Sequence, residues 1–506
     1  MDDIGERVME QRRGKIFFIM AMGQVLLLLL ILLFCNIKYE VSDDFIMEMV
    51  ASGVYTGQPD SHIMFSNIFM GWILTLFYHI NSTVSWFFLI QMLLCLCAYL
   101  AVTYVLTHRL GPEAAVFIVI LLTSFTARDF YILPQFTKTA IAASAGGLLL
   151  IIWGVFYQKK WGICLLGGVL TFFGALVRQK AFYLAVAFAG ILVIYESIRV
   201  LHYEKWSLRK VICKAWLPGV ILLMMVLVCG KLDSLSYMMD SNYSYYREFS
   251  KKRSQILDYT WPTYEECQSD FQDIGITEND YSMILEWNFA DSDFFNLEKM
   301  KQVLQVVLEH RTSQQHSVIE ALRMIKARQL HYPITLCCIF LGVFCIAANW
   351  RKFWVPTAAA IMAVGFLIYF YFAGRWVYRV EFCFLYCAAV VVAYFCELRV
   401  EKKWLNYVIC VVTVIAAFLQ IPKYLPNQKW KTMDAVGYRR MVYDTYYYSW
   451  DYNAAKYTNV VVPGKIHPDF IQTLKSNPDN LYVLDFNTCI QTFYYDFKVF
   501  QSSRNY

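Results

Sequence analysis

The chain has 506 residues, of which 58% are hydrophobic and only 17% are charged, whereas a soluble domain carries roughly 25% charged residues. This composition excludes an ordinary soluble globular protein and makes lipid the solvent for most of the chain. The formal net charge is +6, but the lysines and arginines stand in short clusters between apolar runs, where they orient membrane helices. We therefore expect no nucleic-acid partner.

Apolar runs along the chain are the candidates for membrane spans, for which roughly 17–25 residues are typical. In chain order they lie at about 16–34, 63–80, 84–107, 114–125, 135–157, 161–177, 181–198, 211–230, 331–349, 354–373, 380–397 and 404–421. The first run follows Arg12, Arg13 and Lys15 and lacks a small-x-small cleavage site. It therefore predicts an uncleaved first span.

One of these runs, 63–80, is predicted not to cross the membrane. If it crossed, the basic clusters that follow Tyr157, Ile198, Trp350 and Glu397 would all lie outside, against the positive-inside rule. A helix in the membrane interface, or a re-entrant helix lying against protein, suits this run better. We therefore predict an α-helical polytopic protein with about eleven spanning helices, a cytoplasmic N-terminus and an external C-terminus, in a bacterial plasma membrane.

The spans divide the chain into four predicted parts. These are an N-terminal membrane module at 1–230 with an external first loop at 35–83, a long and mostly helical external loop at 231–330, C-terminal membrane helices at 331–421, and a small external α/β domain at 422–506. The long loop ends in a helix-like pattern of apolar residues, which predicts amphipathic helices packed on the membrane part. The alternative is that the loop is only a spacer.

Acidic residues follow the first span directly. Asp43 and Asp44 fall in the first turn of a short helix that Ser42 is expected to cap and that Gly53 is expected to end. Asp44 and Glu48 share one face at i, i+4, so we expect acids that point into a cavity. The alternative is that two acids at a helix N-terminus only complement its dipole.

Positive charges stand at three predicted external turns, on the side that the positive-inside rule disfavours. They are Arg128, which precedes Asp129, then Arg178 and Lys180, then Arg375 and Arg379. An anionic headgroup or a lipid phosphate would account for such cations. The alternatives are that they snorkel to the outer headgroups or pair with the acids.

The order of these features resembles the GT-C superfamily of integral membrane glycosyltransferases. The shared features are the acidic motif Ser42-Asp43-Asp44 after the first span, the apolar juxtamembrane run 63–80, the basic turn Thr107-His-Arg-Leu-Gly111, the Arg128-Asp129 pair in the second external loop, and a long external loop followed by a terminal external domain. The chain departs from the oligosaccharyltransferase pattern, because its second external loop lacks Asp-x-Asp or Glu-x-Glu and it has no Trp-Trp-Asp motif.

The resemblance implies an inverting glycosyltransferase in which Asp43 or Asp44 is the catalytic base. The expected substrate-binding residues are Glu48, His62, Arg128, Asp129, Arg178, Lys180, Arg375 and Arg379. The implied donor is a polyprenyl-phosphate-linked sugar, and the acceptor is a hydroxyl of a glycan, lipid or protein. Membrane lipid surrounds the spans. The expected reaction needs no cofactor, and a divalent metal is left open.

Two other functions fit part of the pattern. A polysaccharide polymerase of the Wzy or ligase type also uses external arginines and polyprenyl-linked substrates, but without an acid pair after the first span. A flippase or other transporter of lipid-linked glycans would place ionisable groups in the middle of the membrane. The acids of this chain lie mostly outside the cores of the apolar runs.

Overall fold

The computed structural model describes residues 2–35, 37, 39–55, 57–158, 160–259, 261–311, 317–330, 332–349, 353–375, 377–396 and 403–420, with Ser476 and Asn480. Every regular element in these residues is a helix. The chain forms two compact units. The first comprises Met1–Gly230, Tyr332–Ala363 and Tyr378–Tyr506, and the second comprises Lys231–His331 and Val364–Val377. The predicted α/β domain at 422–506 lies outside the described residues except for Ser476 and Asn480, and it stays a prediction.

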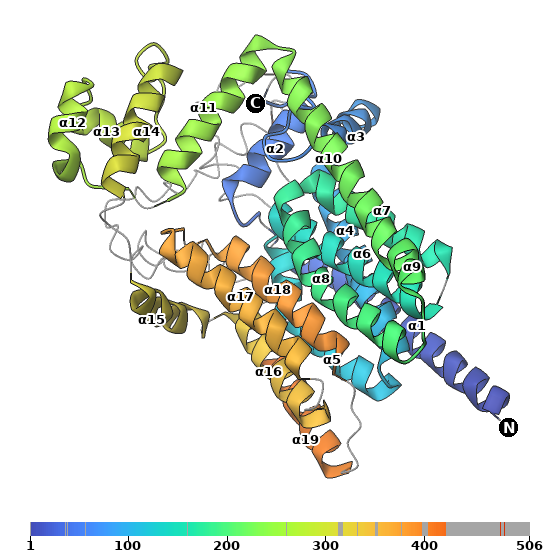
Figure 1. Cartoon of the computed structure of the whole chain (residues 1–506). Helices are drawn as coiled ribbons and strands as arrows, with labels where there is room; N and C mark the ends of the chain where they lie inside the picture. Colours follow the sequence, from blue (N-terminus) through green and yellow to red (C-terminus); the bar gives the residue numbers. More distant parts are fainter. Residues whose placement is uncertain are drawn as a thin grey trace. The chain divides into compact units, whose positions relative to one another are not determined.

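The helices of the first unit begin with α1 and end with α19 (Figure 1). They are α1 (Asp2–Phe34), α2 (Ser42–Ser52), α3 (Ile68–Ile80), α4 (Trp86–Arg109), α5 (Pro112–Ala127), the π-helical turn η1 (Arg128–Ile132), α6 (Phe136–Trp153), the π-helical turn η2 (Gly154–Gln158), α7 (Trp161–Val177), α8 (Gln179–His202), α9 (Leu208–Val211), the π-helical turn η3 (Ile212–Trp216), α16 (Pro333–Asn349), α18 (Tyr378–Tyr394) and α19 (Lys403–Gln420). Two further helices, α10 (Leu217–Met238) and α17 (Trp354–Phe372), begin in this unit.

Seven helical segments of the described residues are long and apolar enough to cross a membrane. They are Val8–Phe34, Trp86–Arg109, Pro112–Ile132, Phe136–Gln158, Gln179–His202, Leu208–Met238 and Trp354–Phe372. Three shorter apolar helices are Ile68–Ile80, Trp161–Val177 and Pro333–Ile346. The chain is therefore a helical membrane protein, while the predicted count of about eleven spans stays a prediction.

Helix α3 occupies the C-terminal part of the run 63–80. Its 13 residues extend for about 20 Å at 1.5 Å per residue, which is shorter than the roughly 30 Å hydrocarbon core of a bilayer. One face is buried at Gly71 and Leu74, while Trp72 and Leu76 are exposed. Two such faces suit a helix that lies along the membrane interface.

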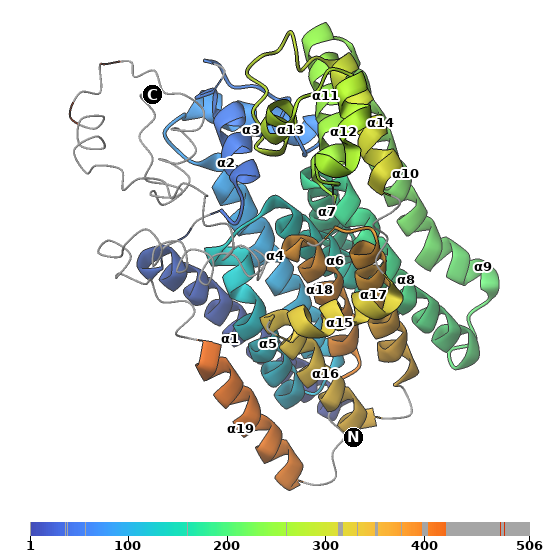
Figure 2. The same ribbon diagram turned by 90° about the vertical axis from the view of Figure 1, so that its left-hand side faces the viewer.

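Helix α6 is the centre of the first unit. It contacts α4, α7, α8 and α18, and Figures 1 and 2 show it among these helices. A Cβ atom on Gly146 would lie 3.0 Å from the carbonyl oxygen of Ala98 on α4, and one on Gly167 of α7 would lie 2.6 Å from the carbonyl oxygen of Gly147. Small residues thus let the backbones approach closely, which stabilises helix pairs in lipid.

We predict that Gly167→Val destabilises the protein by about 1–3 kcal/mol, because the added methyl groups meet the α6 backbone. The matched control is Gly168→Val, because a Cβ there meets nothing within 4 Å and the change in helix propensity is the same. Thermal unfolding of the purified protein in detergent measures both. Equal unfolding midpoints for the two variants would contradict close packing of α6 on α7.

The second unit contains α11 (Ser241–Leu257), the short 3₁₀ turn η4 (Glu265–Cys267), α12 (Gln268–Asp273), α13 (Glu278–Leu285), α14 (Leu297–Arg311) and α15 (Val318–Gln329). Figure 2 shows α11, α12, α13 and α14 gathered together. Their apolar faces share one core, which includes Ile256, Phe271, Ile284, Met300 and Val307. The unit is therefore a small helical domain with a core of its own.

Candidate functional site

The acidic helix α2 ends as the sequence predicts and begins one residue away from the prediction. Gly53 follows its last residue with φ +83°, and the Gly53 amide donates to the carbonyl oxygen of Val50. The predicted cap at Ser42 is wrong, because Ser42 is the first helical residue and Val41 occupies the capping position without a side-chain hydrogen bond. Asp43 and Asp44 still stand in the first turn.

Asp44 is fully buried and holds the start of α6. Its Oδ1 atom accepts a hydrogen bond of 2.7 Å from the backbone amide of Phe136, the first residue of α6, and one of 3.1 Å from the side-chain amide of Gln91 on α4. A carboxyl group at this position satisfies an amide that the helix itself leaves unpaired. Burial raises the pKa of Asp44 well above its usual range, against the effect of the Phe136 amide.

Glu48 is also buried and is held by three hydroxyl groups. Tyr39 donates to Oε2 at 2.8 Å and Tyr78 of α3 donates to Oε1 at 3.4 Å. The Ser85 hydroxyl, just before α4, donates to the same Oε1 atom. Glu48 therefore ties α2 to α3 and α4.

Asp43 is the partly accessible acid of the helix. Its side chain is 25% exposed, and its Oδ2 atom lies 3.9 Å from a guanidinium nitrogen of Arg379, which is 27% exposed. Arg379 is the second residue of α18. A carboxylate and a guanidinium that both reach solvent are available to a ligand, unlike Asp44 and Glu48.

A buried charge cluster formed by Glu40, Asp129 and Lys138 lies beside α2. The Lys138 ammonium is 2.6 Å from Asp129 and 2.9 Å from Glu40, and none of the three side chains is more than 2% exposed. Tyr378, at the start of α18, donates to the other oxygen of Asp129 at 3.1 Å. Burial raises the pKa of Glu40, while the charges of Lys138 and Arg379 oppose the shift.

Arg178 belongs to the same region. It separates α7 from α8, and its guanidinium lies 5.1 Å from the ring centre of Phe65 and 4.8 Å from that of Phe136. Those two rings are stacked on each other. Because Asp44 binds the amide of Phe136, Phe136 links the cation of Arg178 to the acidic helix.

The other predicted binding residues lie in different surroundings. Arg128 begins η1 and is buried. His62 pairs with Asp60 at 3.0 Å. Lys180 is exposed in the first turn of α8. Arg375 belongs to the second unit, where it pairs with Asp258 at 3.1 Å.

The structure thus connects six predicted residues within the first unit. Asp43 contacts Arg379 directly, and the others are linked to this pair through α2, Phe136 and the buried charge cluster: Asp44, Glu48, Asp129 and Arg178. The sequence interpretation missed Glu40, Gln91, Lys138 and Tyr378. Lys138 carried a signal that was available, because it is a lysine just inside an otherwise apolar helical run, and such a residue needs an internal partner. Among the described residues, no group of three or more His, Cys, Asp or Glu side chains could hold a metal ion.

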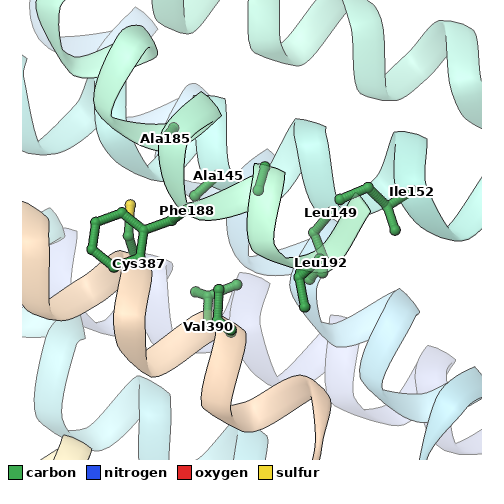
Figure 3. A pocket seen from close by; sticks show the side chains of 10 residues that line it. Ala145, Leu149, Ile152, Ala185, Phe188, Leu192, Cys387 and Val390 are labelled. Atoms are coloured by element: carbon green, nitrogen blue, oxygen red, sulfur yellow. The ribbon is translucent and has the colours of Figure 1, made fainter. Parts of the chain in front are cut away.

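An apolar pocket lies between α6, α8 and α18 (Figure 3). Its lining includes Ala145 of α6, Ala185 and Phe188 of α8, and Cys387 and Val390 of α18. By residue count at 1.5 Å per residue, the pocket begins about 10–12 Å along these helices from Lys138, Arg178 and Arg379. The cavity has a volume of about 20 Å³, which is room for about one water molecule.

A second polar cluster ties the opposite ends of the same helices. Glu196 of α8 is fully buried and accepts hydrogen bonds from Tyr157 at 2.9 Å and from Tyr394, the last residue of α18, at 2.7 Å. Arg199 also binds Glu196 directly, and Arg109, the last residue of α4, donates to Tyr157. This cluster clamps helix ends far from Asp43.

Comparison of the chain with protein-family models, with characterised proteins and with solved structures found no match.

The raised pKa of Asp44 predicts a pH-dependent contribution to stability. Because the folded protein holds this proton more tightly than the unfolded chain, the contribution is complete below about pH 4, the pKa of an unfolded aspartate, and is lost as the pH rises through the raised folded pKa. The unfolding midpoint of wild type minus that of Asp44→Asn should therefore decrease as the pH rises above about 4. A difference that increases with pH would show that Asp44 is bound as a carboxylate.

Proposed function

We propose that the chain is a membrane glycosyltransferase that moves a sugar from a polyprenyl-phosphate donor to a hydroxyl group of a cell-envelope glycan, lipid or protein. The observation that carries the proposal is the pair of Asp43 and Arg379. Both side chains are partly exposed to solvent, and they lie next to the buried acids. A base can take the proton of the attacking hydroxyl group, and a cation can stabilise the charge that develops on the leaving phosphate. The resemblance to the GT-C superfamily supplies the donor class.

Asp43 is the proposed base, and the structure gives a reason to prefer it to Asp44. Asp44 is buried and already accepts hydrogen bonds from Phe136 and Gln91. Asp43 is partly exposed, so a hydroxyl group of an acceptor can approach its carboxylate within hydrogen-bond distance. A general base needs that approach before its pKa matters.

The proposed reaction is one in-line displacement. Asp43 takes the proton of the acceptor hydroxyl, whose oxygen forms a bond to the anomeric carbon. The bond from that carbon to the phosphate oxygen breaks, and its electron pair stays on the leaving phosphate. The anomeric configuration is inverted. Arg379 and Arg178 stabilise the departing phosphate, because guanidinium groups match phosphate oxygens in charge and geometry.

The lipid character of the donor comes from the resemblance to the GT-C superfamily. Lys138, Arg178 and Arg379 lie at or next to the starts of α6, α8 and α18, which are otherwise largely apolar helices. A lipid donor would bring its phosphate to these helix ends from the surrounding membrane.

The proposed topology places this site outside the cytoplasm. Eleven spans, an internal N-terminus and an external C-terminus in a bacterial plasma membrane satisfy the positive-inside rule. The N-terminal ends of α4, α6 and α18 then face the exterior together with α2. Labelling of a cysteine introduced at Gln58, an exposed position of the same loop, with a membrane-impermeant reagent tests this side, after subtraction of labelling in the parent protein.

We predict that Asp43→Asn lowers the rate of sugar transfer by roughly 10²–10⁴-fold, the usual contribution of a general base. Asp44→Asn should lose less, because an asparagine oxygen can still accept the Phe136 amide. The assay is transfer of labelled sugar from polyprenyl-phosphate donors by purified protein, with unfolding midpoints measured for each variant. Full activity of Asp43→Asn would overturn the assignment of the base.

The same assay separates the other functions. Glu113→Gln, which removes an exposed partner of Arg12, is a control for loss of an acid elsewhere. Transfer that continues in the presence of a chelator is expected, because arginines supply the positive charge for the leaving phosphate. If no donor supports transfer but the protein translocates a lipid-linked glycan in vesicles, the chain is a transporter and not an enzyme. Formation of long polymers from lipid-linked repeat units would indicate a polymerase.

A further inference from the structure

Lys138 connects the segment that leads to Asp43 with the segment that leads to Arg379. Its ammonium group touches both Glu40 and Asp129, at 2.9 Å and 2.6 Å, and all three side chains are buried. Its charge also lies 5.1 Å from the ring centre of Tyr378. The cluster is thus a compact ionic contact between Glu40 and the segment 129–138, which are distant in sequence.

Each partner of Lys138 is attached to a residue of the site. Glu40 stands three residues before Asp43, and its backbone amide donates to the carbonyl oxygen of Pro134 at 3.1 Å. Asp129 accepts the hydroxyl of Tyr378 at 3.1 Å, and Tyr378 is the residue before Arg379. Lys138 therefore touches the segment that carries the base and, through Asp129, the segment that carries the cation.

The cluster is costly for stability alone. Removing two carboxylates and an ammonium group from water costs several kcal/mol per ion, and well-packed apolar residues often replace such groups without loss of stability. Ionic contacts are directional, however, and they fix one arrangement of the segments that they join. Stability alone therefore does not explain why three charged groups are buried here. A role in fixing the geometry of the site does explain it.

We infer that Lys138 is a positioning residue that sets the distance between Asp43 and Arg379 by holding Glu40 and Asp129 together. Its effect on transfer rests on the proposed function. Its effect on the distance between residues 43 and 379 does not. These two consequences can be measured separately.

The kinetic test compares Lys138→Met with a neutral cluster that combines Glu40→Gln, Asp129→Asn and Lys138→Met. The single variant leaves two buried carboxylates without their cation and should be strongly destabilised. The neutral cluster should recover the unfolding midpoint but keep a kcat lowered by up to about 10²-fold, because small misplacements of reacting groups are that costly. The KM for the donor should stay within about twofold. Recovery of wild-type kcat together with stability would overturn the proposal.

The second test does not depend on sugar transfer. In Asp43→Cys, the pH dependence of alkylation by a membrane-impermeant thiol reagent reports the pKa of the introduced thiol, after subtraction of labelling in the parent protein. A nearby guanidinium lowers a thiol pKa, so adding Arg379→Gln should raise it. Adding the neutral cluster instead should also raise it if Lys138 sets the spacing.

The direction of the change in the thiol pKa distinguishes a change in spacing from a direct effect of the removed charges. Neutralising the cluster removes no net positive charge, because two carboxylates disappear with one ammonium group. A direct electrostatic effect would therefore leave the thiol pKa unchanged or lower it. A raised pKa supports positioning even if no donor is ever transferred, whereas an unchanged or lowered pKa overturns it. Wild-type protein that transfers no sugar would defeat the proposed function without deciding the thiol result.

Discussion

The site depends on one constraint: the carboxyl groups buried at the start of α6 must find their partners inside the protein. Water does not reach Glu40, Asp44 or Asp129, so each carboxyl group needs partners inside the protein. The first turn of α6 provides these partners. The backbone amide of Phe136 binds Asp44, and the ammonium group of Lys138 binds Glu40 and Asp129. Because α6 packs closely against α4 and α7, the acids are held by a tightly packed helix.

The adjacent residues Asp43 and Asp44 acquire different roles from helix geometry. Successive side chains on an α-helix point about 100° apart, so a helix that buries one acid turns the next toward another direction. Asp44 contacts α6 and α4, and this contact fixes the rotation of α2 about its own axis. The buried acid therefore also determines where Asp43 points. Asp44 thus orients α2, and its neighbour Asp43 is the proposed base.

Local patterns predicted much of this arrangement, and long-range pairing explains what they missed. The stop of α2 at Gly53, the acids in its first turn and a separate helix within 63–80 follow from spacing and residue type. Arg375 and Arg379 looked equivalent in the sequence, but the structure puts them in different units, with Asp258 and Asp43 as their partners. Lys138 lies just inside the apolar run 135–157, so a partner was to be expected, but no local pattern connects it with Glu40.

The geometry of the charges, more than their number, distinguishes the site from the polar cluster at the other helix ends. Glu196 is fully buried, and tyrosine hydroxyls and the Arg199 guanidinium make direct hydrogen bonds to it, so its carboxyl group is already occupied. Asp43 and Arg379 are 3.9 Å apart and partly exposed, which exceeds the roughly 2.7–2.9 Å of a direct charge-assisted hydrogen bond. Such a loose pair loses little when each partner turns to a ligand. In the proposed reaction, Asp43 then turns to the acceptor hydroxyl group and Arg379 turns to the phosphate of the donor.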